Sequence, residues 1–418
     1  MSAPTVPSAT EAELARGQTR NLLVATLAST VGFWAWTIVG PLAGRYTQEM
    51  DLSATQTGVL VAMPILVGSI ARIPVGALTD RYGGRLMFTA LLGATAPLVL
   101  LTGLVGQMGL FVPLLAVVFF LGIAGAVFAI GIPFCSAWYP ASRKGFATGV
   151  FGAGMVGTAV SAFATPILVN SIGYLGTHIL VAVLVAATAL ACWMFLRESP
   201  ANRGREPQPA LPRILGAFRK TVTWQLCFLY GVVFGAFVAF SNYLPTYLGN
   251  VYDYSATDAG LRTAGFAVAA VVARPVGGIL ADRIGPRTVT LTSLAGVVLL
   301  AVIVAFQPGA ERVYGPVFLL LAVFLGFGTG GVFGWVGRAA DPRDVGTIGG
   351  IIAAAGGLGG YFPPLVMGAT YDPEHQSYFV GLILLAVFAA VAFLLTFTVR
   401  NGGRTDERTA APKASGAT

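Results

Sequence analysis

The sequence predicts an all-α, polytopic membrane protein with twelve transmembrane helices in two pseudo-symmetric halves of six. The first observation is composition: 56% of the 418 residues are hydrophobic and 10% are charged, whereas a soluble domain carries about 25% charged residues. The second is a series of twelve apolar runs, and the third is an internal repeat. This composition excludes a disordered chain, a coiled coil and a disulfide scaffold, and it argues against a water-soluble enzyme.

The apolar runs follow one another between charged or Pro/Gly-rich breaks, and each is long enough for a membrane helix of about 20 residues. Segment 197–220 is rich in Pro and Arg and is interpreted as a linker between an N-terminal half (21–196) and a C-terminal half (221–399). Residues 1–20 and 400–418 are interpreted as a terminal segment and a disordered tail. The twelve expected spans are 21–44, 56–79, 86–106, 110–138, 145–170, 177–196, 222–248, 257–281, 288–307, 315–336, 345–369 and 377–399.

Basic residues between the runs determine the orientation, because cytoplasmic loops carry an excess of Lys and Arg. If both termini are cytoplasmic, the terminal segment, the even-numbered loops and the tail hold 20 of the 25 basic residues. The outer loops hold three (Arg45, Arg262 and Arg312), and two arginines lie inside runs. We expect a multi-pass protein of the cytoplasmic (inner) membrane, surrounded by lipid, with both termini cytoplasmic and no cleavable signal peptide.

Other function classes find little support. The net charge of +8 does not indicate nucleic-acid binding, because the basic residues lie in short loops without interleaved aromatic side chains. Cys135, Cys192 and Cys227 lie inside apolar runs without a CxxC spacing or a nearby histidine, so they are interpreted as packing residues. The runs contain no acid–base pair or nucleophile of an enzyme. We expect no metal, no cofactor and no nucleic-acid partner.

A repeated segment relates the two halves. ARIPVGALTDRYGGR (residues 71–85) has a counterpart in ARPVGGILADRIGPR (residues 273–287) at an offset of 202 residues. A second motif pair with the same offset consists of glycines in the fifth and eleventh runs, Gly154 with Gly356 and Gly157 with Gly359. Two motif pairs that share one offset predict a duplicated bundle of six plus six helices.

The charged part of the repeat resembles the cytoplasmic loop signature of the major facilitator superfamily, which implies the major facilitator fold. Acidic and basic side chains at helix ends can hold helices together in one conformation and release them in another. The matching residues are therefore interpreted as a conformational latch. They are Gly76, Asp80, Arg81 and Arg85 in the first copy and Gly278, Asp282, Arg283 and Arg287 in the second.

Two arginines lie deep inside apolar runs at equivalent positions of the repeat. Arg72 and Arg274 each precede the loop aspartate of their copy by eight residues, which places each about 12 Å inside the membrane. An isolated arginine is costly there, and no Asp or Glu lies deep in any run. Because a forked guanidinium suits a small planar oxyanion, the two residues predict an anion site near the midplane.

The glycine-rich parts of the fifth and eleventh runs make the resemblance more specific. GAGMVGTAV and AAGGLGGYFPP are similar to the two nitrate signatures of the nitrate/nitrite porters, a family of the major facilitator superfamily. The resemblance covers residues 20–400 and implies that Arg72 and Arg274 bind the substrate. The other positions at which it implies a substrate-binding role are Phe128, Met155, Tyr230, Phe234, Gly154, Gly157, Gly356, Gly357 and Gly359.

One position departs from the family pattern. The first signature usually carries an asparagine, implied to contact the anion, where this chain has Met155. Since a thioether cannot donate a hydrogen bond, one polar contact is missing. Both arginines are retained, so an anion is still expected. Nitrate, nitrite and other small anions, such as cyanate or a short carboxylate, stay open as substrates.

These observations predict a secondary active transporter, acting as a monomer, that moves nitrate and/or nitrite by alternating access. Nitrate/nitrite exchange and proton-coupled uptake both stay open. Exchange is favoured because the two histidines, His178 and His375, lie toward the outer side and the spans lack acidic residues. A non-transporting nitrate sensor is a further alternative, although the 19-residue polar tail lacks the periodicity of a signalling domain.

Overall fold

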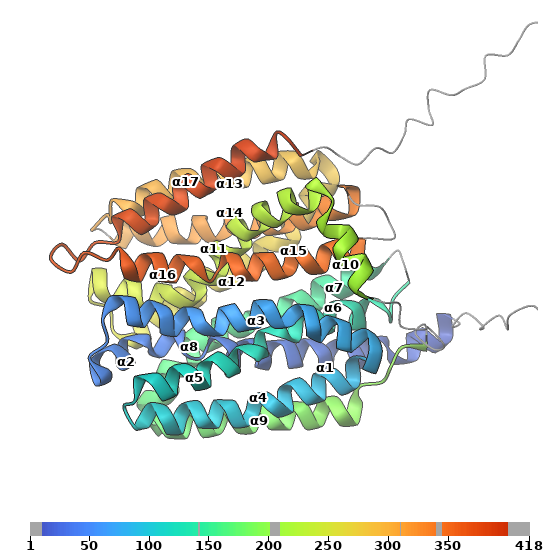
Figure 1. Ribbon diagram of the computed structural model, residues 1–418, viewed down its shortest axis with the longest axis horizontal. Helices are drawn as coiled ribbons and strands as arrows, with labels where there is room; N and C mark the ends of the chain where they lie inside the picture. The colour runs from blue at the N-terminus through green and yellow to red at the C-terminus, as the bar shows by residue number, and fades with distance from the viewer. Residues whose placement is uncertain (1–10, 141–142, 201–209, 310, 340–344, 400–418) are drawn as a thin grey trace, which may run out of the picture.

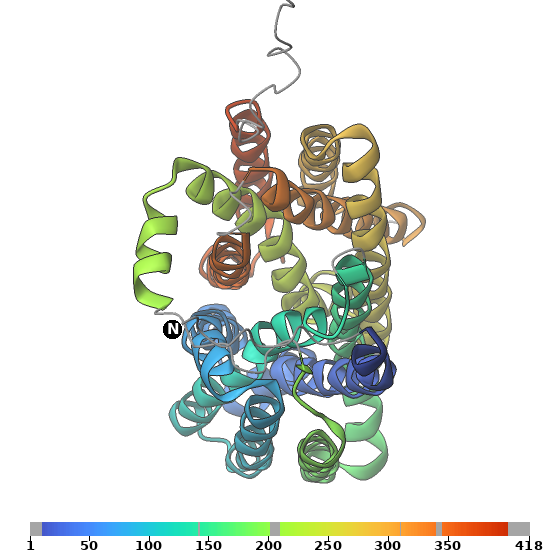
Figure 2. The same cartoon turned by 90° about the vertical axis from the view of Figure 1, so that its right-hand side faces the viewer.

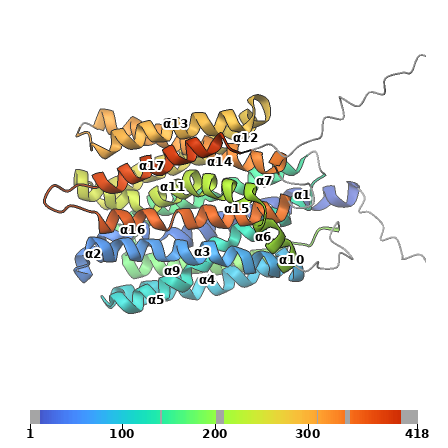
Figure 3. The ribbon, with the colours of Figure 1, turned by 45° about the horizontal axis from the view of Figure 1, so that its top comes forward.

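The computed structural model describes residues 11–140, 143–200, 210–309, 311–339 and 345–399 as a bundle of helices (Figure 1). Twelve helical spans within these ranges are long and apolar enough to cross a membrane. They run along one common direction, as a second view also shows (Figure 3). The predicted fold class, an all-α polytopic membrane protein with twelve spans, is confirmed.

The N-terminal half contains six spans, and a short 3₁₀ turn interrupts three of them. All three turns begin at a glycine, which lowers the helix propensity; these glycines are Gly40, Gly122 and Gly154. The helices are α1 (Glu11–Thr37), η1 (Gly40–Leu42) and α2 (Ala43–Met50); α3 (Ala54–Tyr82); α4 (Gly84–Gln107); α5 (Phe111–Leu121), η2 (Gly122–Ala126) and α6 (Val127–Ser136); α7 (Lys144–Ala153), η4 (Gly154–Val156) and α8 (Gly157–Ile172); and α9 (Tyr174–Phe195).

The C-terminal half contains the other six spans. Two prolines in the first turn of α16 separate it from α15, because proline cannot donate a backbone hydrogen bond within a continuing helix. The helices are α11 (Thr221–Tyr252), α12 (Ala256–Ile284), α13 (Pro286–Ala305), α14 (Glu311–Ala339), α15 (Val345–Gly359) with α16 (Phe362–Ala369), and α17 (Phe379–Thr396).

Two expected connecting segments contain helix. Within the expected linker 197–220, a short helix, α10 (Ala210–Phe218), contacts α11 and α15. Helix α1 begins at Glu11, before the expected start of the first span, because backbone hydrogen bonds continue the helix beyond the apolar run. Residues 1–10 and the expected tail 400–418 lie outside the described part of the chain.

The backbone confirms the duplication. Helices α3 and α12 both have 29 residues, and both of their ends are related by the offset of 202 residues. Each starts after a serine whose side chain accepts a hydrogen bond from the backbone of the third helical residue. Each ends at a glycine with positive φ, Gly83 at 84° and Gly285 at 94°, a conformation that residues with a Cβ rarely adopt. The two halves are thus pseudo-symmetric in detail.

The two ends of the bundle differ. We call the end that carries both described chain ends and α10 the terminal face, and the other end the opposite face (Figures 1 and 2). At the opposite face, helices of one half approach the other half through glycines. A methyl group on Gly58 would lie 2.5 Å from the carbonyl oxygen of Pro364. A methyl group on Gly260 would collide with the carbonyl oxygen of Ala162.

These contacts form a pseudo-symmetric seal. Gly58 and Gly260 are separated by 202 residues, and so are their partners. Gly40 and Asn242 are also equivalent positions, and a methyl group on Gly40 would lie 2.5 Å from the carbonyl oxygen of Asn242. This last contact therefore lies at the pseudo-twofold axis. We call the contacts of Gly40, Gly58 and Gly260 the opposite-face seal.

Several glycines in the same membrane spans, nearer the terminal face, have free space beside them. A methyl group on Gly76 would meet one atom, the Cβ of Ala129, at 4.0 Å. For the others, no heavy atom would lie within 4 Å; they are Gly149, Gly152, Gly278, Gly349 and Gly350. The halves are therefore closed on each other at the opposite face and are not packed through these glycines at the terminal face.

Candidate functional site

Arg72 lies in the middle of α3 and is 4% exposed. Its Nη1 donates to the carbonyl oxygen of Ala353 on α15, at 2.6 Å, and thus reaches the other half. Its Nε donates to the carbonyl oxygen of Gly125 in the 3₁₀ turn η2, at 3.4 Å. Its Nη2 is buried and has no hydrogen-bond partner among the described residues. A buried charged donor without a partner is costly, so this atom is where a ligand acceptor is expected.

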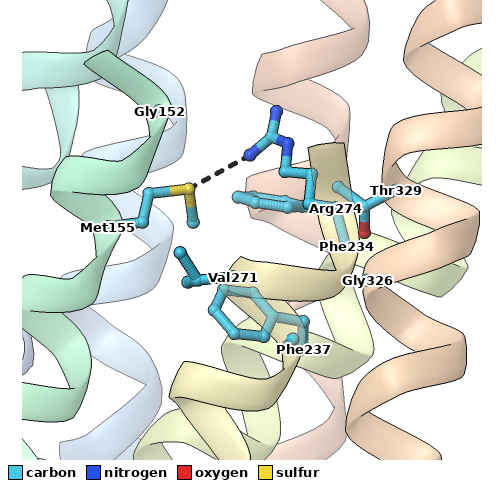
Figure 4. Close-up of a pocket in the computed structure, with 9 residues that line it drawn as sticks. Gly152, Met155, Phe234, Phe237, Val271, Arg274, Gly326 and Thr329 are labelled. Carbon is cyan, nitrogen blue, oxygen red and sulfur yellow. Dashed lines mark hydrogen bonds between the residues drawn. The ribbon is translucent and has the colours of Figure 1, made fainter. Parts of the chain in front are cut away.

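Arg274 occupies the equivalent position on α12 and is partly exposed. Its Nη1 donates to the sulfur of Met155 on η4, at 3.1 Å, and this contact also joins the two halves (Figure 4). Its Nη2 donates to the hydroxyl oxygen of Tyr230 on α11, at 3.1 Å. Neither Arg72 nor Arg274 forms an ion pair within the described residues. The ion pairs found there are made by Arg45, Arg262, Arg338 and His375.

Two phenylalanines lie next to both guanidinium groups. The Cζ of Arg72 lies 5.8 Å from the ring centroids of Phe128 and Phe234. The Cζ of Arg274 lies 5.5 Å from the ring of Phe128 and 5.8 Å from that of Phe234. Tyr230 stacks on Phe234 with a centroid distance of 5.0 Å and an interplanar angle of 8°. The two positive charges thus share an aromatic environment that stabilises cations.

A cavity adjoins the Arg274 side of this site (Figure 4). The hydroxyl of Thr329 donates to the carbonyl oxygen of Leu325, so the wall offers few free polar atoms besides the guanidinium. The residues that line the cavity are Gly152, Met155, Phe234, Phe237, Ala270, Val271, Arg274, Gly326 and Thr329.

Comparisons with known proteins assign the chain to a family. The sequence model of the Major Facilitator Superfamily matches residues 25–362 and 252–417. The chain is 55% identical over 381 residues to the probable nitrate/nitrite transporter NarK2 of Mycobacterium tuberculosis, covering 91% of this chain and 96% of that protein. It is 35% identical over 378 residues to the nitrite extrusion protein of Bacillus subtilis, covering 90% and 93%. The chain belongs to the nitrate/nitrite porter family of the major facilitator superfamily.

A further relative and a solved structure agree with this assignment. The porter is 38% identical over 412 residues to the probable nitrate/nitrite antiporter NarK1 of Thermus thermophilus, covering 90% of each. Its fold is similar to that of a bacterial homolog of the human lysosomal transporter Spinster, with a TM-score of 0.72 at 18% identity and coverage of 94% and 98%. The porter is therefore a membrane transporter of this superfamily and not an enzyme.

The predicted site glycines fall into two groups. A methyl group on Gly356 would collide with the ring of Tyr230, and one on Gly357 would lie 3.2 Å from the Nη1 of Arg72. These two glycines therefore make room for site residues. Methyl groups on the others would collide with neighbouring helices, Gly154 with Ser29, Gly157 with Thr30 and Gly359 with Gly231. The second group allows close helix packing around the site.

Several groups at the site were not predicted from the sequence. Trp36 lies beside Arg72, with its ring centroid 6.0 Å from the Cζ, and Phe333 lies beside Arg274 at 5.7 Å. Ser69 lies one turn before Arg72, where its hydroxyl would collide with a methyl group on Gly357. The carbonyl oxygens that accept from Arg72 had no sequence signal at all, because every residue has a carbonyl. The spacing of Ser69 from Arg72 was the one available sign.

The predicted latch residues lie at the terminal face, and two of them act within their own halves. Arg85 donates from Nε to the carbonyl oxygen of Trp193 at the end of α9, at 2.9 Å. Its counterpart Arg287 donates to the carbonyl oxygens of Thr396 and Phe397 at the end of α17. Cations stabilise the last carbonyls of a helix. These two arginines thus connect the third span of each half to the last span of the same half, α4 to α9 and α13 to α17.

Two other charged residues of this region, Asp282 and Arg81, contact partners in their own halves. Asp282 lies 3.7 Å from the Nη2 of Arg338 on α14, and the guanidinium of Arg81 lies 5.2 Å from the ring of Tyr82. The Glu198 carboxylate accepts from the backbone N–H of Arg85 at 2.7 Å. Burial raises the pKa of the Glu198 carboxyl, and the backbone N–H groups at the start of α4 partly oppose this.

Proposed function

We propose that the porter transports nitrate and nitrite by alternating access, with the anion held between Arg72 and Arg274. The names of its relatives, which include a probable nitrate/nitrite transporter and a nitrite extrusion protein, support this substrate class. The observation that carries the proposal is the pair of guanidinium groups beside Phe128 and Phe234. Two positive charges without a carboxylate partner in the described site favour an anion.

The geometry suits a small planar anion. The buried Nη2 of Arg72 offers a free donor, and the fork of a guanidinium can donate two parallel hydrogen bonds to the two oxygens of one edge. The rings of Phe128 and Phe234 would face the anion on either side and limit its size. An anion between both forks would join the halves, because Arg72 belongs to one half and Arg274 to the other.

We further propose that both termini are cytoplasmic and that the porter lies in the cytoplasmic membrane, since the basic residues follow the positive-inside distribution. The opposite-face seal would then close the site toward the outside. In the alternate state, the halves would rock about the anion, open the seal and close at the terminal face.

Exchange of nitrate for nitrite is the coupling that we favour. No carboxylate or histidine lies beside the two arginines within the described residues. His178 is buried near the opposite face and contacts the carbonyl oxygen of Tyr174 through Nδ1, at 2.9 Å. Without a carboxylate or a histidine beside the arginines in the described site, the anion itself is the simplest means of neutralising them while the halves move. Proton symport is the competing mechanism.

A transporter of another small anion is the second candidate, and Met155 is the observation that favours it. Its sulfur accepts from Arg274 and cannot donate to nitrate. Cyanate and short carboxylates have fewer acceptor oxygens than nitrate, so the missing donor would lower their binding affinity less than that of nitrate.

Uptake of labelled nitrate into proteoliposomes tests the function. We expect uptake that internal nitrite stimulates and that an imposed pH gradient leaves unchanged. Uptake that requires the pH gradient would replace exchange by proton symport. Absence of nitrate and nitrite flux under all conditions, together with flux of labelled cyanate or formate, would favour the second candidate.

A further inference from the structure

Met155 stands where the family pattern has an asparagine, and the sequence indicated only a missing hydrogen-bond donor. In the structure, Met155 has a direct contact with the site. Its side chain is 1% exposed, and its sulfur accepts a hydrogen bond from the Nη1 of Arg274. The thioether thus occupies a donor of the guanidinium that an anion would otherwise use. A thioether is a weak acceptor, whereas an anionic oxygen forms a stronger, charge-assisted hydrogen bond with the same N–H group.

The cavity beside Arg274 offers a place for the displaced side chain. Met155 lines this cavity together with apolar side chains that include Phe237 and Val271 (Figure 4). Methionine has three rotatable side-chain bonds and packs well into irregular apolar space. The thioether can therefore leave Arg274 by rotating about its own bonds.

The other arginine, Arg72, has no such side-chain ligand among the residues that the structure describes. The residue equivalent to Met155 by the offset of 202 residues is Gly357, which lies against Arg72. Arg72 donates instead to the backbone oxygens of Gly125 and Ala353, and its Nη2 is left without a partner. The two halves of the site thus differ: Arg72 is ready to bind an acceptor, and Arg274 is covered.

We propose that Met155 is a displaceable intramolecular ligand of Arg274, which an entering anion replaces and which moves into the adjoining cavity. This inference rests on the proposed anion site. Because the anion must compete with the sulfur, Met155 lowers anion affinity. It also favours release, since the thioether returns to the guanidinium as the anion departs. Met155 is in this sense a specificity-determining residue, because only anions that accept strongly from a guanidinium displace it.

The first test is Met155→Leu, which keeps the volume of the side chain and removes the sulfur. Nitrate binding to the purified full-length porter is measured by titration calorimetry. We expect the Met155→Leu variant to bind nitrate about threefold more tightly than the wild type, the effect of removing one weak hydrogen bond. Met367→Leu, at a buried methionine that packs against Gly381 on α17, is the matched control and should bind as the wild type does.

Equal or weaker binding by Met155→Leu overturns the displacement proposal. Failure of the proposed function gives a different result, because the wild type itself would then show no nitrate or nitrite binding.

The second test asks whether the cavity receives the thioether. Val271→Phe fills the cavity, so we expect nitrate affinity to fall about tenfold in the Met155 background. In the Met155→Ala background no long side chain has to move, and Val271→Phe should then have little effect. An equal loss of nitrate affinity in both backgrounds would mean that the phenylalanine disturbs Arg274 directly. That result would overturn the proposal that Met155 moves into the cavity.

Discussion

The two guanidinium groups of the site differ in how far their donors are satisfied. Arg72 is buried and retains a free Nη2, whereas the Nη groups of Arg274 contact Met155 and Tyr230. Both are forked donors that a lysine cannot replace, because an ammonium is a point charge without two parallel N–H bonds. The residues are therefore expected to be sensitive to a change that keeps the charge.

Arg72→Lys and Arg274→Lys should each weaken nitrate binding by about tenfold or more and abolish measurable uptake in proteoliposomes. Arg262→Lys is the matched control, since Arg262 forms an exposed ion pair with Glu311, which a lysine can also make. That variant should retain uptake. Retained uptake by both site variants would contradict an anion clamp.

Glu198 gives a prediction of pH dependence. Burial raises the pKa of its carboxyl above the ordinary value of 4.5, so the folded protein favours the protonated form. Its contribution to stability is present below the ordinary pKa and is lost as pH rises through the folded value. Glu198→Gln removes the titration and keeps an oxygen that can accept from Arg85. The melting temperature of this variant relative to the wild type should rise as the pH increases from the ordinary pKa of 4.5 through the raised pKa of the folded protein. A melting-temperature difference that does not change with pH would contradict a raised pKa of Glu198.

Much of the site could be predicted at this scale, and for identifiable reasons. A charge inside an apolar run stands out, so Arg72 and Arg274 were predicted from the residues themselves. Tyr230, Phe128 and Phe234 followed from the resemblance to the porters. Trp36 and Phe333 could not be predicted, because an aromatic residue in an apolar run looks the same whether it packs on lipid or on a guanidinium. The acceptor role of Met155 required the geometry.

At the scale of helices, the opposite-face seal joins α3 to α16, α12 to α8, and η1 to α11 through glycines. Gly58→Val and Gly260→Val should each prevent this close approach, because the added carbons would meet the backbone of the other half. We expect folded variants that lack transport. Spin labels at Asp51 and Asp253, both exposed at the opposite face, should report longer distances than in the wild type. Unchanged distances would argue against a seal.

The glycines near the terminal face should show the converse behaviour. Gly76 and Gly278 have room for a side chain in this structure, so Gly76→Val and Gly278→Val should leave the same spin-label distances short. Transport should nevertheless be lost, because these positions would meet the other half when the terminal face closes. Gly93→Val, where a side chain also has room, is the control and should transport normally. Full transport by the first two variants would contradict this role.

The helix boundaries show what patterning predicts and what it misses. The apolar runs predicted all twelve spans, since crossing the lipid requires a minimum helix length. The helix α10 was missed, because the Pro- and Arg-rich linker around it indicated irregular structure. Asp80 and Asp282 were expected at helix ends, and they lie in the last turns of α3 and α12. Arg85 and Arg287 bind carbonyl oxygens of their own halves, a contact that the loop pattern does not reveal.

At the scale of the molecule, the duplication determines most of the architecture. An offset of 202 residues relates the two arginines, the capped ends of α3 and α12, and the contacts of the opposite-face seal. The symmetry is broken at Met155 and Gly357, which occupy equivalent positions beside Arg274 and Arg72. In the proposed mechanism, the two halves would therefore offer the anion different ligands, and the anion would bind the two arginines one after the other.

The opposite-face seal has a consequence for how its opening responds to the surrounding solution. The hydrogen bonds that join the halves there are neutral, from Asn170 to Thr257 and from Thr55 to the carbonyl oxygen of Gly368. The ion pairs of Arg45, Arg262 and His375, which lie toward this face, each stay within one half. Salt screens charges and leaves van der Waals contacts between backbones unaffected. We therefore expect the free energy of opening the opposite-face seal to depend little on ionic strength.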